Sequence, residues 1–201
     1  MNNDKYRSAA VITSTIGRPS LVRAIQSVAK QTYPCTHYVF VDGNQFADQA
    51  KAILDEYPQV IAVYLPMNTG ANGWSNSAIN AIAPFLVKED VICYLDDDNW
   101  YTENHITHCM QTLNQFDVDY VYSLRNFYAS EHEFICPDFI ESLGKYRNRI
   151  MYPLQFNIIR WGGVKYLWFE LGRHSPILIL IVMPFQENWR FQYRRNGIVA
   201  N

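Results

Sequence analysis

Residues 9–43 read AAVITSTIGRPSLVRAIQSVAKQTYPCTHYVFVDG, and this stretch decides the fold. Its beginning, AAVITST (9–15), is an apolar run that predicts a buried strand. The segment 18–33 that follows has apolar residues at helical spacing and Pro19 near its start, which predicts a helix. A second apolar run, HYVFVDG (37–43), predicts another strand. Strand, helix and strand in this order indicate an α/β domain with a mostly parallel sheet.

The same alternation continues to about residue 125. Helices are predicted over 46–57, 75–87 and 103–116, and strands over 60–66 and 91–95. A further strand is predicted over 118–128, with a hairpin return at EFICP (133–137). From about residue 150 the pattern has neither clean helical nor clean strand periodicity. We therefore predict helices flanking a mostly parallel sheet, followed by an irregular C-terminal segment.

Composition restricts the class of protein. The chain has 201 residues, 49% of them hydrophobic, which is enough for one full core. A net charge of -2 gives no reason to expect nucleic acid as a partner. Four cysteines without a C-x-x-C pair indicate reduced thiols in a cytoplasmic protein. The N-terminus lacks the apolar stretch of a signal peptide, and the longest apolar run, 176–185, is shorter than the roughly 20 residues of a membrane span.

Charge is unevenly distributed along the chain. From Gly144 onward there are nine Lys/Arg and two acids. Residues 1–143 hold eight Lys/Arg and seventeen acids. This basic segment also contains Trp161, Trp168 and Trp189. Basic residues mixed with Trp suit peripheral contact with an anionic membrane, here the inner face of the cell membrane. An ordinary charged face with core aromatics is the alternative.

Polar residues stand at the carboxyl end of each predicted strand, which is where open α/β sheets bind ligands. They are Thr13, Ser14 and Thr15; Asp42 and Gly43; the loop NTGANGW (68–74); and Asp96, Asp97 and Asp98. Four separate polar clusters therefore converge on one edge of the sheet. This convergence is stronger evidence for a binding site than any single cluster.

The three consecutive aspartates in YLDDDNWY (94–101) require a partner. Adjacent carboxylates repel unless a cation or hydrogen bonds hold them. A turn can bring Asp96 and Asp98 onto one Mg²⁺ or Mn²⁺, since both ions prefer oxygen ligands. The alternative is a helix N-cap, because acids favour that end of a helix. Capping accounts for one of the three side chains and not for all of them.

The other clusters each have two interpretations. The carboxylate of Asp42 could accept hydrogen bonds from a nucleobase or a ribose, although Asp-Gly is also a common turn pair. The guanidinium of Arg18 could meet a phosphate, and a surface role is equally open. Gly70 and Gly73 would let the backbone approach a ligand closely, as they would in a plain flexible loop.

Residues 8–128 resemble a family 2 glycosyltransferase with the GT-A fold. The resemblance lies in the opening strand with its Thr-containing turn and Arg-Pro, in the Asn-x-Gly loop of NTGANGW, and in the Asp-x-Asp strand end of YLDDDNWY. It implies a GT-A nucleotide-sugar-binding domain over residues 1–150. Residues 151–201 would then be a short, atypical C-terminal segment of the same domain.

The resemblance also implies a reaction. A sugar would move, with inversion, from a nucleotide diphosphate to an acceptor hydroxyl of a glycan or lipid-linked precursor in cell-surface polysaccharide synthesis. Asp42 would contact the base, Asp96 the ribose or the metal, and Asp98 would ligate Mg²⁺ or Mn²⁺. The expected nucleotide-sugar-binding residues are Thr13, Ser14, Thr15, Arg18, Asp42, Asn68, Gly70, Asn80, Asp96 and Asp97.

One residue departs from the family pattern, and the catalytic base stays open. Ile79 stands where an Arg often precedes the Asn equivalent to Asn80, which removes an expected diphosphate contact. A carboxylate must also lie within hydrogen-bond reach of the acceptor hydroxyl, and Asp138, Glu141 and Glu187 are the candidate bases.

Rival functions follow from the same residues. A non-catalytic nucleotide-sugar-binding or scaffold protein of a glycan-assembly complex would keep the acidic cluster without the base. A sugar nucleotidyltransferase would need a Gly-rich loop after the first strand, where TSTIGRPS has only Gly17. The sequence argues against a Rossmann dehydrogenase, because no G-x-G-x-x-G follows a strand.

Overall fold

The computed structural model describes residues 6–73, 75–116, 120–121, 123, 126–130, 132–137 and 158–160. The alternation of strands and helices predicted from the sequence is confirmed. The elements are β1 (Ala9–Thr15), α1 (Leu21–Ala29), β2 (Cys35–Val41), η1 (Asn44–Phe46), α2 (Ala47–Leu54), β3 (Ile61–Tyr64), η2 (Ala71–Gly73), α3 (Ser77–Ile82), η3 (Ala83–Phe85), β4 (Val91–Tyr94), α4 (His105–Phe116), β5 (Tyr120–Val121), β6 (Asn126–Ser130), β7 (Glu133–Pro137) and β8 (Ile158–Arg160).

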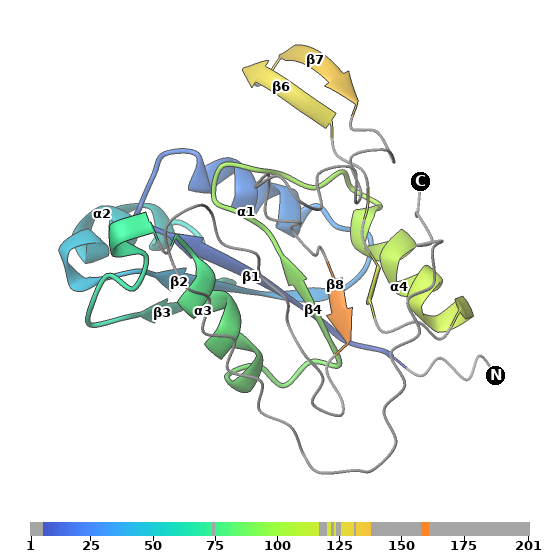
Figure 1. Cartoon of the computed structure of the whole chain (residues 1–201). Coiled ribbons are helices and arrows are strands. Elements are labelled where there is room, and N and C mark those ends of the chain that lie inside the picture. Colours follow the sequence, from blue (N-terminus) through green and yellow to red (C-terminus); the bar gives the residue numbers. More distant parts are fainter. Residues whose placement is uncertain are drawn as a thin grey trace, which may run out of the picture.

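Six strands form the main sheet, in the order β3-β2-β1-β4-β8-β5 (Figure 1). Strands β3, β2, β1 and β4 are parallel, while β8 runs antiparallel to both β4 and β5. The predicted α/β fold with a mostly parallel sheet is therefore confirmed. Among the described residues, no helix has the length and apolar character needed to cross a membrane.

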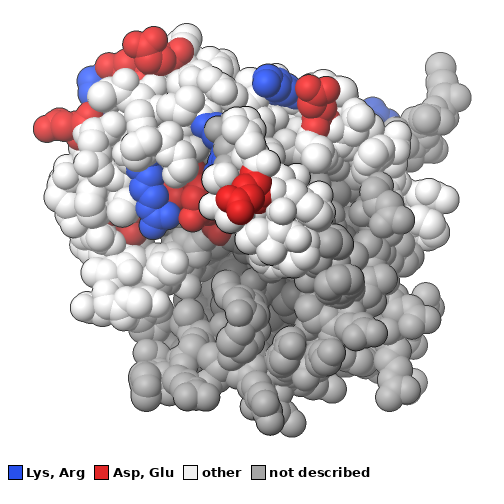
Figure 2. Space-filling view, turned by 90° about the horizontal axis from the view of Figure 1, so that it is seen from above, with Lys and Arg blue, Asp and Glu red and all other residues white. Residues whose placement is uncertain are grey.

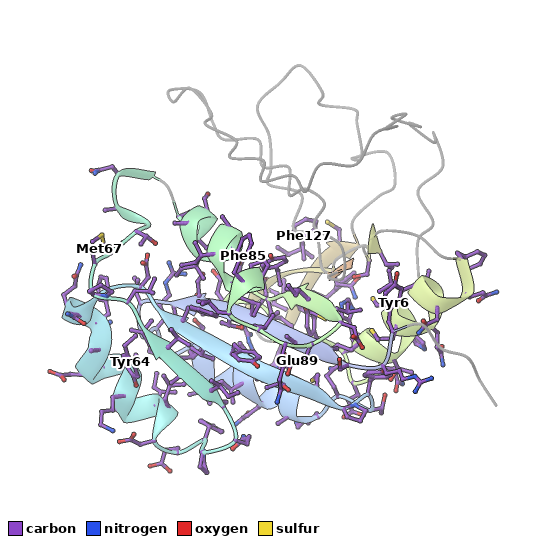
Figure 3. All side chains as sticks on the ribbon, turned by 90° about the horizontal axis from the view of Figure 1, so that it is seen from below. Tyr6, Tyr64, Met67, Phe85, Glu89 and Phe127 are labelled. Atoms are coloured by element: carbon purple, nitrogen blue, oxygen red, sulfur yellow. The ribbon has the colours of Figure 1, made fainter. Side chains whose placement is uncertain are left out.

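Helices cover both faces of the sheet, which explains why its strands are almost continuously apolar. Successive side chains of a strand point to opposite faces. Val11 of β1 therefore packs in a cluster with residues of α1 and α4, whereas Ile12 packs against α3 and η3. Three acids are buried among the described residues, and two of them, Asp42 and Asp97, lie at the ends of strands. Glu89 (Figure 3) accepts a hydrogen bond from the Tyr38 hydroxyl at 3.1 Å.

Helix α1 is shorter than its predicted range of 18–33. Arg18–Ser20 form a turn in which the Leu21 amide donates to the Arg18 carbonyl at 3.1 Å. At the other end, the Gln31 side chain donates to the carbonyl oxygens of Ser27 and Thr102. The first bond gives a carbonyl group in the last turn of α1 a hydrogen-bond partner, and the second ties this end of the helix to the segment after β4.

One prediction for the C-terminal half is wrong. The single strand predicted over 118–128 is two elements, because β5 pairs with β8 in the main sheet and β6 pairs with β7 in a separate hairpin. A run of strand-forming residues does not specify which partner each part finds. The segment predicted to be irregular after residue 150 contributes β8, which is too short at three residues to show a period. The predicted hairpin return at 133–137 is confirmed as β7.

Candidate active site

The carboxyl ends of β1, β2 and β4 meet at one edge of the sheet. The Asp42 amide donates to the Thr15 carbonyl at 2.9 Å, and the Leu95 amide donates to the Ile12 carbonyl at 3.0 Å. The parallel register sets Thr15 opposite Val41 and Ile12 opposite Tyr94. As a result, the polar residues that follow β2 and β4 lie on either side of the end of β1.

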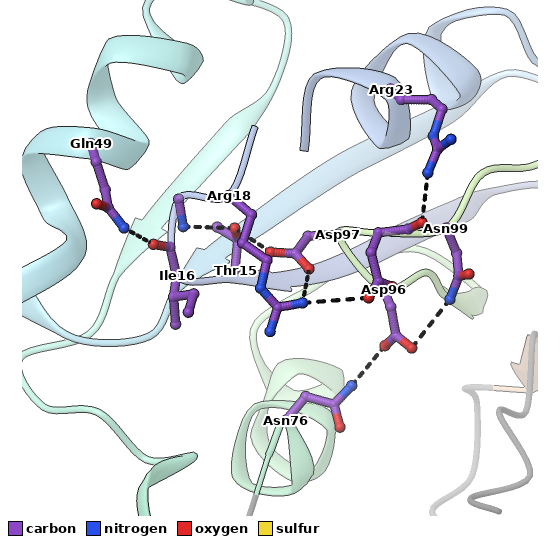
Figure 4. A network of polar contacts seen from close by, with 11 residues as sticks. Thr15, Ile16, Arg18, Arg23, Gln49, Asn76, Asp96, Asp97 and Asn99 are labelled. Carbon is purple, nitrogen blue, oxygen red and sulfur yellow. Dashed lines mark hydrogen bonds and ion pairs between the residues drawn. The ribbon is translucent and has the colours of Figure 1, made fainter. Parts of the chain in front are cut away.

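Asp97 points inward at this edge. Its side chain is only 7% exposed and receives the Thr15 hydroxyl at 2.7 Å and an Arg18 nitrogen at 3.3 Å (Figure 4). Burial raises the pKa of the Asp97 carboxyl, and the Thr15 hydrogen bond and the charge of Arg18 oppose that rise. This aspartate therefore has internal partners that fasten the loop after β4 to the end of β1.

Asp98 points outward. Its side chain is 55% exposed, and an Arg18 nitrogen lies 3.4 Å from its carboxylate. The same guanidinium nitrogen thus bridges Asp97 and Asp98. An exposed carboxylate held by one long ion pair is open to a cation or to a ligand arriving from solvent.

Asp96 is oriented by two carboxamides. Asn76 donates to one carboxylate oxygen at 2.9 Å, and Asn99 reaches the other at 3.4 Å. Because Asn76 directly precedes α3, this contact ties the start of α3 to the end of β4 (Figure 4). Neither asparagine was predicted as a site residue, although Asn99 stands within YLDDDNWY and Asn76 follows the loop NTGANGW by two residues.

Arg23 of α1 supports the acidic loop from behind. It donates to the Asp98 carbonyl at 2.9 Å, and its guanidinium carbon lies 3.9 Å from the centre of the Trp100 ring. A cation over an aromatic face is attracted by the negative face of the ring. The sequence contained no signal for this role, since Arg23 lies 75 residues before its partner.

Asp42 holds the loop that follows β3. Its carboxylate accepts hydrogen bonds from the Thr69 amide at 2.7 Å, the Thr69 hydroxyl at 2.8 Å and the Gly70 amide at 2.9 Å. A Cβ at Gly70 would lie 2.9 Å from a carboxylate oxygen of Asp42 and would also collide with the Ser75 carbonyl. Glycine is therefore required at this position, and Asn68 is carried to the same edge. Contact between Asp42 and a base stays a prediction.

Other predicted site residues lie further inside. Thr13 is fully buried, and its hydroxyl is hydrogen-bonded to the His37 ring at 2.9 Å. Burial lowers the pKa of His37 to about 3, so the ring is neutral. Asn80 is also buried, and its carbonyl accepts the Tyr94 hydroxyl at 2.9 Å. Ser14 is half-buried on the opposite face of β1. The structure brings Thr15, Asp42 and Asp96–Asp98 together at the edge, and leaves Thr13 and Asn80 in the interior.

The candidate bases Asp138, Glu141 and Glu187 lie outside the described residues, as do Trp161, Trp168 and Trp189 of the basic segment. Their roles stay predictions.

The carboxylate oxygens at this edge of the sheet are the type of ligand that Mg²⁺ and Mn²⁺ prefer. Magnesium usually takes one or two carboxylates together with substrate phosphates and waters. Asp96 and Asp98 would supply the two carboxylates. Within the part of the chain that the structure describes, no cluster of three or more His, Cys, Asp or Glu could hold a metal. Two carboxylates match what a metal needs when it shares its ligands with a bound diphosphate.

Solved structures share this architecture. The crystal structure of TarS from S. aureus is 18% identical, with a TM-score of 0.56 over 76% of this chain and 28% of TarS. The crystal structure of TarS 1-349 in complex with UDP is 14% identical, with a TM-score of 0.51 over 62% of this chain and 37% of that one. These likenesses place the chain in the class of proteins with the GT-A fold.

The sequence match defines the family within that class. The model of glycosyl transferase family 2 matches residues 10–165, which is most of the chain. The chain belongs to this family. It is also 28% identical over 102 residues to the succinoglycan biosynthesis protein ExoW of Rhizobium meliloti (strain 1021). That match covers 49% of this chain and 31% of ExoW, so the chain spans about a third of the length of this relative.

Proposed function

We propose that this protein is a metal-dependent glycosyltransferase that moves a sugar from a nucleotide diphosphate to an acceptor hydroxyl in cell-surface polysaccharide synthesis. The observation that carries the proposal is the position of Asp42, Asp96 and Asp98 at one edge of the sheet, at the ends of the two parallel strands that flank β1, in a family 2 chain. Further support comes from TarS, crystallised with UDP and with UDP-GlcNAc, and from ExoW, named for succinoglycan biosynthesis.

The donor would bind with its diphosphate at the outer side of the acidic loop. Asp96 and Asp98 would hold Mg²⁺ or Mn²⁺, which neutralises the charge that develops on the leaving diphosphate. Arg18 stands beside Asp98 and offers a second positive charge to the phosphates. The loop that Asp42 holds, residues 68–70, would close around the nucleoside.

The acceptor side needs a carboxylate that takes the proton from the attacking hydroxyl. Asp138, Glu141 and Glu187 are the candidates for this base. Attack from the side opposite the leaving diphosphate would invert the sugar carbon. The glycan or lipid-linked acceptor would be met in the cytoplasm, at the inner face of the membrane, where the basic segment from Gly144 onward would touch anionic lipids.

One observation favours the non-catalytic alternative. The side chain of Ile79 is fully buried in α3, at the position where the family often has an Arg for the diphosphate. Without that Arg, the protein would bind the diphosphate of the donor more weakly. Its role in a glycan-assembly complex could then be to bind the nucleotide sugar without transferring it. Binding and turnover of the donor must therefore be measured separately.

The test is a calorimetric titration of the purified chain with nucleoside diphosphates, with and without Mn²⁺, followed by an assay for slow hydrolysis of the matching nucleotide sugar. We expect Mn²⁺-dependent binding, weakened about 100-fold or more by Asp98→Asn because a metal ligand is lost. Asp55→Asn is the matched control, because that exposed carboxylate pairs with Lys51 at the far end of α2.

The outcomes separate the two functions. Hydrolysis together with metal-dependent binding supports a working transferase. Binding without hydrolysis, with any of the nucleotide sugars tried, supports the binding protein. If Asp98→Asn binds as tightly as the Asp55→Asn control, the acidic loop is not the donor site.

A further inference from the structure

The β6–β7 hairpin exposes aromatic rings to solvent. All five residues of β6 are exposed, with Tyr128 at 38%, and Phe134 of β7 is exposed at 53%. The hairpin stands off the main body of the molecule (Figure 1). Rings that serve a core are buried, as Phe40 is in β2. Exposed rings grouped on one element instead mark a surface that binds something.

These rings form a continuous strip that begins at the acidic loop. The Trp100 and Tyr128 ring centres lie 5.1 Å apart, and those of Tyr128 and Phe134 lie 5.6 Å apart. Arg23 contacts Trp100 from behind and also holds the Asp98 carbonyl. We call Trp100, Tyr128 and Phe134 the aromatic strip. It leads from the carboxylates at the donor edge to the outside of the molecule.

The charge of the hairpin argues against an anionic ligand. The sequence from 126 to 137 has two acids, Glu131 and Glu133, and no Lys or Arg. On the face of the molecule in Figure 2, basic groups lie next to acidic groups in several places, and an uncharged area surrounds a separate acidic group near the centre. An anionic lipid or a phosphorylated ligand would require basic side chains here. Polar groups that can bond to hydroxyls are present, because Asn126 and Ser130 are exposed beside the rings.

The size of the hairpin excludes a large protein partner on this surface. Each of its strands has five residues, which span about 17 Å at about 3.4 Å per residue. A stable protein interface needs about 800 Å² from each side, and a face of two such strands offers much less. A narrow, extended ligand is what a strip of this length accommodates.

We propose that the aromatic strip is the platform for the acceptor, and that the acceptor is a neutral carbohydrate chain. This inference rests on the proposed glycosyltransferase function. The apolar C–H face of a sugar ring carries slight positive charge and packs on the negative face of an aromatic ring. A chain lying along Phe134 and Tyr128 would bring its terminal hydroxyl toward Trp100 and the acidic loop, where the donor sugar is expected.

The experiment measures binding of neutral glucose hexasaccharides, one β-1,4-linked, one β-1,3-linked and one α-1,4-linked, to the full chain by calorimetry without any donor. We expect at least one to bind, and the double substitution Tyr128→Ala/Phe134→Ala to weaken that binding about tenfold or more. The matched control is Phe85→Ala, which removes a ring that is 61% exposed on η3 (Figure 3) and is not one of the three rings of the strip.

A second titration, with UDP and Mn²⁺, separates this inference from the proposed function. The double variant should bind UDP as the wild type does, which a general loss of folding would not allow. If the wild type binds hexasaccharide but no nucleotide, the proposed function fails while the strip stands as a carbohydrate site.

Three outcomes would overturn the inference. The first is no binding of any hexasaccharide, and the second is an equal loss of binding in the double variant and in Phe85→Ala. The third is binding to phosphatidylcholine vesicles that depends on Tyr128 and Phe134, which would make the strip a lipid-contacting surface.

Discussion

The inner and outer sides of the polar edge are built from the same kinds of residue but do different things. On the inner side, Thr13, Thr15 and Asp97 are buried and bonded to protein groups. On the outer side, Asp98 keeps more than half of its side chain in solvent. Neighbouring aspartates in one short run are thus divided between holding the fold and offering a ligand site. A run of acids cannot be treated as a single functional unit.

The largest expected effect on stability comes from the inner side. Thr15→Val removes the hydroxyl that donates to Asp97 and accepts the Gly17 amide, which lies 2.9 Å away. Leaving buried polar groups without partners costs about 2–3 kcal/mol of unfolding free energy. Urea unfolding measures this loss. Thr36→Val, a half-buried threonine of β2, is the control, and an equal loss there would remove the distinction between the two sides.

A second expected effect is pH-dependent. The pKa of His37 is lowered to about 3 by burial, against 6.5 for an ordinary histidine. The unfolded chain therefore takes up a proton below pH 6.5 that the folded chain refuses until about pH 3. The stability contributed by neutral His37 is complete above pH 6.5 and is lost as the pH falls through this window. At pH 5 the loss is about 2 kcal/mol.

Urea unfolding at pH 7 and pH 5 tests this expectation in the wild type and in His37→Gln, which can still bond to Thr13 but does not titrate. The variant should lose about 2 kcal/mol less between the two pH values than the wild type. The wild type and the variant share the buried His105, whose pKa burial lowers to about 4, so its contribution cancels. Parallel pH profiles would mean that His37 is not protected from protons in the folded state.

The smallest expected effect on stability belongs to the outer side. Asp98→Asn removes an exposed ion pair, and such pairs contribute little. We expect its unfolding free energy to stay within about 0.5 kcal/mol of the wild type, although metal-dependent nucleotide binding should weaken about 100-fold or more. A loss as large as that of Thr15→Val would show that Asp98 also holds the fold.

The hairpin marks the limit of prediction from this sequence. The strand predicted over 9–15 coincides with β1, and the prediction for 91–95 differs from β4 by one residue. Both are apolar runs buried between helices, so local pattern and tertiary environment agree. The range 118–128 has strand-forming residues too, but it divides between two sheets, because pairing depends on β7 and on the distant β8.

The sequence by itself determined where the polar segments would gather, because the carboxyl ends of parallel strands must share an edge. It did not determine which way each side chain would point. Asp97 turns inward because Thr15 and Arg18, about 80 residues earlier, meet it there. Trp100 joins the aromatic strip because Arg23 and Tyr128 approach it from two other elements. Contacts between residues so far apart in the chain form only when the sheet and its helices pack, so the tertiary structure alone decided the division between fold and site.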